Sequence, residues 1–139
     1  MSSSLTMRFV RFLPLICCLC LIFLPSGCGD SNPVNSFEPE IVNNPDDFIF
    51  RVRNAYLVTT RLTYNWTNSG QRATIEHLSG RTGGTGALTI LDADGNTVYY
   101  SELKSSGTDG TSPGNAGRWT IVLQLNEYSG TIYFRVRKL

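Results

Sequence analysis

The segment Asp92-Ala93-Asp94-Gly95-Asn96 is the strongest candidate for ion chemistry in this sequence. Its oxygen donors stand at alternate positions, as the first ligands of a calcium loop do. A complete loop also needs a glycine where Thr97 stands and a bidentate glutamate where Leu103 stands. We therefore expect a hairpin turn and no metal site here, with three weak candidates for a cation: Asp92, Asp94 and Asn96.

His77 is the single histidine of the chain, and it follows Ala73 and Ile75 in phase along an alternating segment. A catalytic base needs a nucleophile or a second titratable group beside it, and the sequence has no Gly-x-Ser-x-Gly motif. We expect a structural or surface histidine. We accordingly predict no catalytic residue, no enzymatic activity and no cofactor.

The tetrapeptide Phe-Arg-Val-Arg occurs twice, at residues 50–53 and 134–137. If the two copies lie on neighbouring strands, their apolar side chains point inward and their arginines form one basic patch that binds an anion or a partner: Arg51, Arg53, Arg135 and Arg137. The alternative is a solvated outer face on which arginines protect edge strands from aggregation. Four tyrosines outside the inward phases are candidates for stacking on sugar rings: Tyr56, Tyr99, Tyr128 and Tyr133.

The elements that position these residues are strands, because apolar and polar side chains alternate along most of the chain after residue 46. Seven alternating segments are expected, over residues 48–53, 58–66, 73–77, 88–91, 97–100, 119–125 and 132–136. No amphipathic helix interrupts them, and this pattern predicts an all-β, antiparallel two-sheet β-sandwich, jelly-roll-like or Ig-like. Its predicted inward side chains are Phe48, Phe50, Val52, Val58, Leu62, Tyr64, Trp66, Ile75, Leu88, Ile90, Trp119, Ile121, Leu123, Ile132, Phe134 and Val136.

Four segments carry a resemblance to a known family: residues 46–50, 88–96, 117–122 and 129–136. They resemble the bacterial pre-peptidase C-terminal domain, a jelly-roll-like β-sandwich that accompanies secreted enzymes. The resemblance implies a non-catalytic accessory module. No protease domain precedes it in this sequence, so the resemblance predicts the fold and leaves the role open.

The first 27 residues resemble a bacterial lipoprotein signal. Arg8 and Arg11 precede an apolar run over residues 12–24, and Ser26-Gly27-Cys28 matches the end of a lipobox, although Pro25 stands where leucine is usual. The resemblance implies cleavage before Cys28 and lipidation of its thiol. We expect a signal peptide over residues 1–27, a lipidated cysteine and flexible tether over 28–45, and a β-sandwich over 46–139. Phe37, Ile41 and Val42 are expected to dock the end of the tether on the domain.

Composition narrows the function further. The chain has 139 residues, 12 Lys and Arg against 11 Asp and Glu, and a net charge of +1, whereas nucleic-acid binding usually requires a strongly basic domain. Three of the four cysteines leave with the signal, so we expect no disulfide within the mature chain and no structural zinc. The sequence thus predicts a lipid-anchored, non-catalytic binding or scaffolding module of the cell envelope, on the outer membrane where there are two. Its partners are the membrane, through Cys28, and an unknown envelope protein or glycan. The alternative is a carbohydrate-binding module at the cell surface.

Overall fold

The structure is a computed structural model and describes residues 37–139. The expected signal peptide, Cys28 and most of the expected tether lie outside the described residues. The described part is all-β, with six strands: β1 (Glu40–Asn44), β2 (Asp47–Asn68), β3 (Ala73–Leu91), β4 (Thr97–Glu102), β5 (Gly107–Gly110) and β6 (Gly117–Lys138). All pairs are antiparallel, in the order β1-β2-β6-β3-β4, and β5 pairs with β3. This confirms the all-β antiparallel fold.

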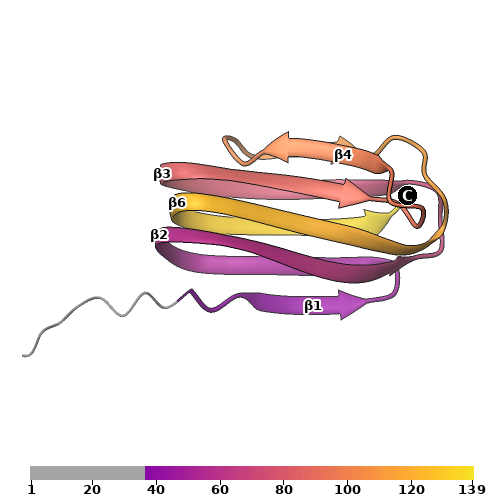
Figure 1. Cartoon of the computed structure of the whole chain (residues 1–139), viewed down its shortest axis with the longest axis horizontal. Coiled ribbons are helices and arrows are strands. Elements are labelled where there is room, and N and C mark those ends of the chain that lie inside the picture. Colours follow the sequence, from indigo (N-terminus) through magenta and orange to yellow (C-terminus); the bar gives the residue numbers. More distant parts are fainter. Residues whose placement is uncertain (1–36) are drawn as a thin grey trace, which may run out of the picture. The chain divides into compact units, whose positions relative to one another are not determined.

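Three strands are far longer than the usual five or six residues, because each runs through both layers of the sandwich. Strands β2 and β6 have 22 residues each and β3 has 19. Figure 1 shows β2, β6 and β3 each folding back, so that one half of the strand lies in front of the other. The first layer consists of β1, β5 and residues 47–52 of β2, 73–80 of β3 and 131–138 of β6. The second layer consists of β4 and residues 60–68 of β2, 86–91 of β3 and 117–125 of β6.

Because the chain stays in the sheet at the bends, the seven expected segments form four strands, β2, β3, β4 and β6, and the unexpected β1 and β5 bring the number to six. Register shifts interrupt the ladders at Val52 to Thr60 and at Arg81 to Thr85, as β-bulges do. Positive φ angles accompany them, at Leu57 (49°), Gly84 (65°), Glu127 (48°) and Gly130 (130°). Residues 81–86 are rich in glycine, which is typical of a loop that ends a strand. They bend β3 instead, and its hydrogen bonding with β6 continues on both sides of the bend.

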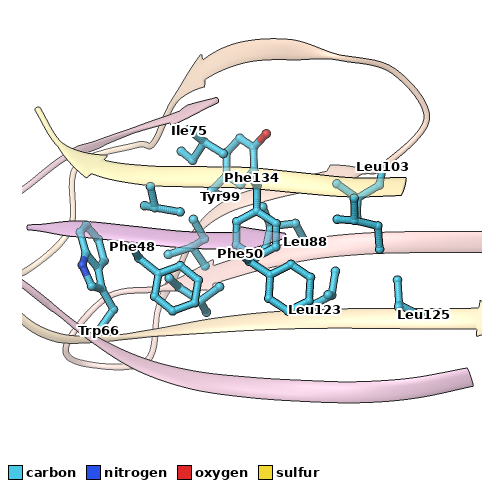
Figure 2. Close-up of a cluster of buried hydrophobic side chains, with 14 of the residues drawn as sticks. Phe48, Phe50, Trp66, Ile75, Leu88, Tyr99, Leu103, Leu123, Leu125 and Phe134 are labelled. Carbon is cyan, nitrogen blue, oxygen red and sulfur yellow. The ribbon is translucent and has the colours of Figure 1, made fainter. Parts of the chain in front are cut away.

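The core lies between the two layers (Figure 2). All side chains predicted to point inward are buried, except Leu62 and Tyr64, which are half-buried and pack against the core. Trp66 and Trp119 pair directly across β2 and β6, and their rings meet edge to face with centroids 5.9 Å apart. Both indoles are buried, as the alternation predicts, and each donates its N–H to a backbone carbonyl, of Asn44 and Asn115 respectively. Such a core holds the fold through apolar contacts and aromatic pairs.

The domain begins earlier than the sequence predicts. The sequence predicts a tether over residues 40–44, but these residues form β1, which pairs with residues 47–51 of β2. Their side chains are exposed, so the strand is held by backbone hydrogen bonds and leaves no alternation to detect. Phe37 packs against the core, whereas Ile41 and Val42 are exposed. Within residues 37–139, no helix is long and apolar enough to span a membrane.

Candidate functional site

The repeated arginines lie on neighbouring strands of the first layer. Residues 47–52 of β2 pair with residues 132–137 of β6, which places Arg51 opposite Tyr133 and Ile49 opposite Arg135. The Phe and Val of each copy are buried, and the arginines point away from the core. The two copies of Phe-Arg-Val-Arg therefore lie on neighbouring strands with their arginines on the same outer surface, as the hypothesis of a shared patch requires.

Two acidic side chains, Asp47 and Glu40, lie beside these arginines. Arg135 donates two hydrogen bonds to Asp47, at 2.7 and 2.8 Å, and this bidentate pairing holds the pKa of Asp47 below its ordinary value. Arg51 and Arg53 each lie 3.5 Å from a carboxylate oxygen of Glu40 on β1. Three of the four arginines are thus paired with an acid, and Arg137 stands opposite Asp47 in the register, so the four do not form the uniformly basic patch that the sequence suggests. The segment expected to be a tether supplies the acid that the prediction missed.

A groove of about 440 Å³ crosses the outer surface of the first layer. We call this surface the first-layer face; the side chains lining its groove are Arg51, Arg53, Glu76, Leu78, Thr131 and Tyr133. Arg51 lies over the ring of Tyr133, with its guanidinium carbon 5.5 Å from the ring centre. Leu78 is 51% exposed. A second groove shares Arg53 and Thr131 with the first and extends it to Tyr56, which is 57% exposed.

The outer surface of the second layer carries a different groove, of about 320 Å³. We call it the Tyr100 groove; its lining is Thr85, Gly86, Ala87, Thr89, Tyr100, Glu102, Gln124 and Asn126. Tyr100 is 61% exposed, although the alternation around it gave no sign of this. A register shift between Ile90 and Leu91 leaves the consecutive residues Val98 and Tyr99 both buried. Inward and outward side chains therefore do not alternate here, and the sequence pattern does not predict that Tyr100 points outward.

The four predicted tyrosines do not form one platform. Tyr56 is exposed, Tyr133 is half-buried beneath Arg51, and Tyr99 and Tyr128 are buried. Tyr99 and Tyr128 are therefore not candidates for stacking on sugars. Tyr128 closes the core at the bend, where its hydroxyl donates to the carbonyl of Thr131 and lies 3.0 Å from the hydroxyl of Ser79. Burial raises the pKa of Tyr99 to about 12, so it stays a neutral donor.

Asp92 serves as a turn anchor. Its Oδ1 accepts the backbone N–H groups of Asp94 and Asn96, at 3.0 and 2.8 Å, and its Oδ2 accepts that of Asn115, at 3.1 Å. These hydrogen bonds, that of Asn115 above all, hold the pKa of Asp92 below its ordinary value. Gly95 has a φ of 85°, as the expected hairpin requires. Within residues 37–139, no group of three or more acidic, histidine or cysteine side chains is arranged to hold a metal ion.

His77 is buried and faces β5. Its Nε2 lies 3.3 Å from Oδ2 of Asp109, which also accepts the hydroxyl of Tyr99 at 3.0 Å. Nδ1 is buried and has no hydrogen-bond partner among the described residues. This cluster attaches β5 to β3, whose register pairs His77 with Gly107.

Comparison with known proteins supplies no family. No family model and no curated protein matches the chain. It is similar to the CBM36-1 domain of a multidomain xylanase from the hindgut metagenome of Trinervitermes trinervoides, with 16% identity and a TM-score of 0.39 over 73% of this chain and 86% of that one. It is also similar to accessory secretory protein 1, 2 and 3 of Streptococcus pneumoniae, with 11% identity and a TM-score of 0.35 over 80% and 92% of the two chains.

A third similarity is to the glycosylation-associated protein (Gap123) complex of Streptococcus agalactiae, with 13% identity and a TM-score of 0.36. It covers 74% of this chain and 40% of that one. At these identities and TM-scores, none of the three similarities carries an argument about function.

Proposed function

We propose that this chain is a lipid-anchored, non-catalytic binding module of the cell envelope, and that its first-layer face docks a partner protein. The anchor is a lipid on the thiol of Cys28, which becomes the first mature residue after cleavage behind Gly27, and the membrane is the outer one where there are two. The basis for the anchor is the sequence: two arginines, a short apolar run and small residues before a cysteine.

The groove on the first-layer face is the observation that carries the docking proposal. It combines an exposed leucine, a tyrosine and two arginines, and tyrosine and arginine are enriched among the residues that dominate binding energy. Arg51 and Arg53 meet Glu40 at 3.5 Å only, while Arg135 holds Asp47 at 2.7 Å. The looser pairs can exchange Glu40 for a carboxylate of the partner. The fitting partner therefore presents an apolar side chain flanked by acidic ones.

Three titratable groups that could do chemistry are engaged in the scaffold, and this supports a non-catalytic role. Asp47 holds Arg135, Asp92 holds three backbone N–H groups, and His77 holds Asp109. An acid–base pair for catalysis needs groups that converge on a substrate site.

The test is capture of a partner from detergent-solubilised envelope by the immobilised full chain. The wild type is compared with a variant carrying Leu78→Thr and Tyr56→Ser. Both positions are exposed, so the smaller polar side chains should leave the strands folded. Thr63→Ser, at an exposed position on the other layer, is the control. We expect a protein captured by the wild type and by Thr63→Ser that the double variant loses. Equal capture by all three proteins would refute docking on the first-layer face.

The second candidate is a carbohydrate-binding module at the cell surface. The Tyr100 groove favours it, because an exposed aromatic ring there stands beside amide and hydroxyl side chains.

A further inference from the structure

The Tyr100 groove is shaped by a small residue between longer ones. Ala87 on β3 pairs with Glu102 of β4 on one side and with Gln124 of β6 on the other. Two residues further along β3, and therefore on the same face of the sheet, Thr89 pairs with Tyr100. Directly paired side chains stand about 5 Å apart, so a methyl group between a carboxylate and an amide leaves a trough with raised walls. The backbone of Gly86 adds to its floor.

We infer that this trough binds a neutral sugar ring of a glycan, with Tyr100 as the stacking platform. A pyranose has an apolar face of C–H groups and a rim of hydroxyls that both donate and accept hydrogen bonds. The exposed ring of Tyr100 suits the first, and the exposed amides of Gln124 and Asn126 suit the second because each amide offers donors and an acceptor. A volume of about 320 Å³ lies within the range of roughly 300–1,000 Å³ that small-molecule sites show.

The charges of the groove favour a neutral ligand. Glu102 is the charged residue of its lining, and Lys104 forms an ion pair with that carboxylate. The positive charge of Lys104 is already paired with Glu102. No residue of the lining is a lysine or arginine that could pair with the carboxylate of an acidic sugar. The groove on the first-layer face is the less suitable sugar site, because Arg51 covers the ring of Tyr133.

This inference specifies the ligand of the carbohydrate-binding candidate above, and it concerns the opposite layer from the docking proposal. Loss of glycan binding therefore leaves the docking proposal standing, and loss of docking leaves this one standing.

The experiment is calorimetric titration of the detergent-solubilised full chain with four probes: cellohexaose, mannohexaose, chitohexaose and, as the acidic counterpart, hexagalacturonate. We expect at least one neutral hexasaccharide to bind, and hexagalacturonate to bind more weakly than it. Tyr100→Ala should weaken that binding about tenfold, since an aromatic contact of this kind is worth about one factor of ten. Gln124→Ala should weaken it about threefold through a lost hydrogen bond.

Two controls separate the site from the fold. Tyr100→Phe keeps the ring and should bind as the wild type does. Tyr56→Ala removes an equally exposed tyrosine at the bend and should also leave binding unchanged. The inference is overturned if the wild type binds none of the neutral probes, if hexagalacturonate binds most tightly, or if Tyr100→Ala binds as well as the wild type.

Discussion

The fold-back of the long strands makes a sharp prediction at Gly130. A Cβ at this position would lie 2.1 Å from the carbonyl oxygen of Gly80 and 3.0 Å from Cα of Arg81, both on the neighbouring strand. Because these are backbone atoms, a side-chain rotation cannot relieve the contact. Gly130→Ala must therefore push β3 and β6 apart at the bend, in addition to straining a φ of 130°.

Gly95 is the control that separates the strain of a positive φ from the steric clash at Gly130. Its φ is 85°, and a Cβ there would meet nothing within 4 Å. Gly95→Ala should destabilise by about 1–2 kcal/mol, the cost of a positive φ alone. Gly130→Ala should add about 1–3 kcal/mol of overpacking, for a total of about 2–5 kcal/mol. Gly110→Ala, with open space and no positive φ, should be close to neutral.

Urea unfolding of the full chain in detergent measures the difference, followed by the fluorescence of the two buried tryptophans. A total of about 2–5 kcal/mol is a large part of the roughly 5–15 kcal/mol that stabilises a typical domain. If Gly130→Ala unfolds at the same urea concentration as Gly95→Ala, the close approach of β3 and β6 at the bend is wrong.

Three further predictions concern the core, acid stability and the anchor. Trp119→Ala should destabilise by about 3–5 kcal/mol in the same assay, because it removes a fully buried indole, and a loss below about 1 kcal/mol would contradict its place in the core. The ionised carboxylate of Asp92 stabilises the fold at pH values above the ordinary pKa of 3.8, because its pKa is lowered in the folded state. This contribution is lost as the pH falls through the lowered pKa. Melting curves should therefore show a smaller drop between about pH 7 and pH 3 for Asp92→Asn than for the wild type, and equal drops would refute this. Cys28→Ala should release the protein from the membrane fraction and abolish its acyl mass, whereas unchanged fractionation would contradict lipidation.

The sequence predicts the layers well and the bends poorly. Alternation marks Phe48, Trp66, Trp119 and Phe134 as inward, and all four are buried, because a period of two follows directly from strand geometry. The bends are invisible to alternation, since residues 81–86 read as a loop by composition. Hydrogen bonds to neighbours far away in sequence keep them in the sheet.

The candidate sites show the same division. The hairpin at residues 92–96 follows from local turn chemistry and is confirmed. The pairing of the arginines depends on Glu40, whose strand carries no alternating pattern, and the exposure of Tyr100 depends on a register shift. Neither feature is local, so neither could be read from the residues around it.

Photo-crosslinking in living cells tests the central claim, a binding module with a docking face, most directly. A photoreactive amino acid replaces Leu78 on the first-layer face, and in a second strain it replaces the exposed Thr63 on the second layer. The account predicts one discrete protein adduct from position 78 that is absent from position 63. An absence of adducts from position 78, or the same adducts from both positions, would contradict it.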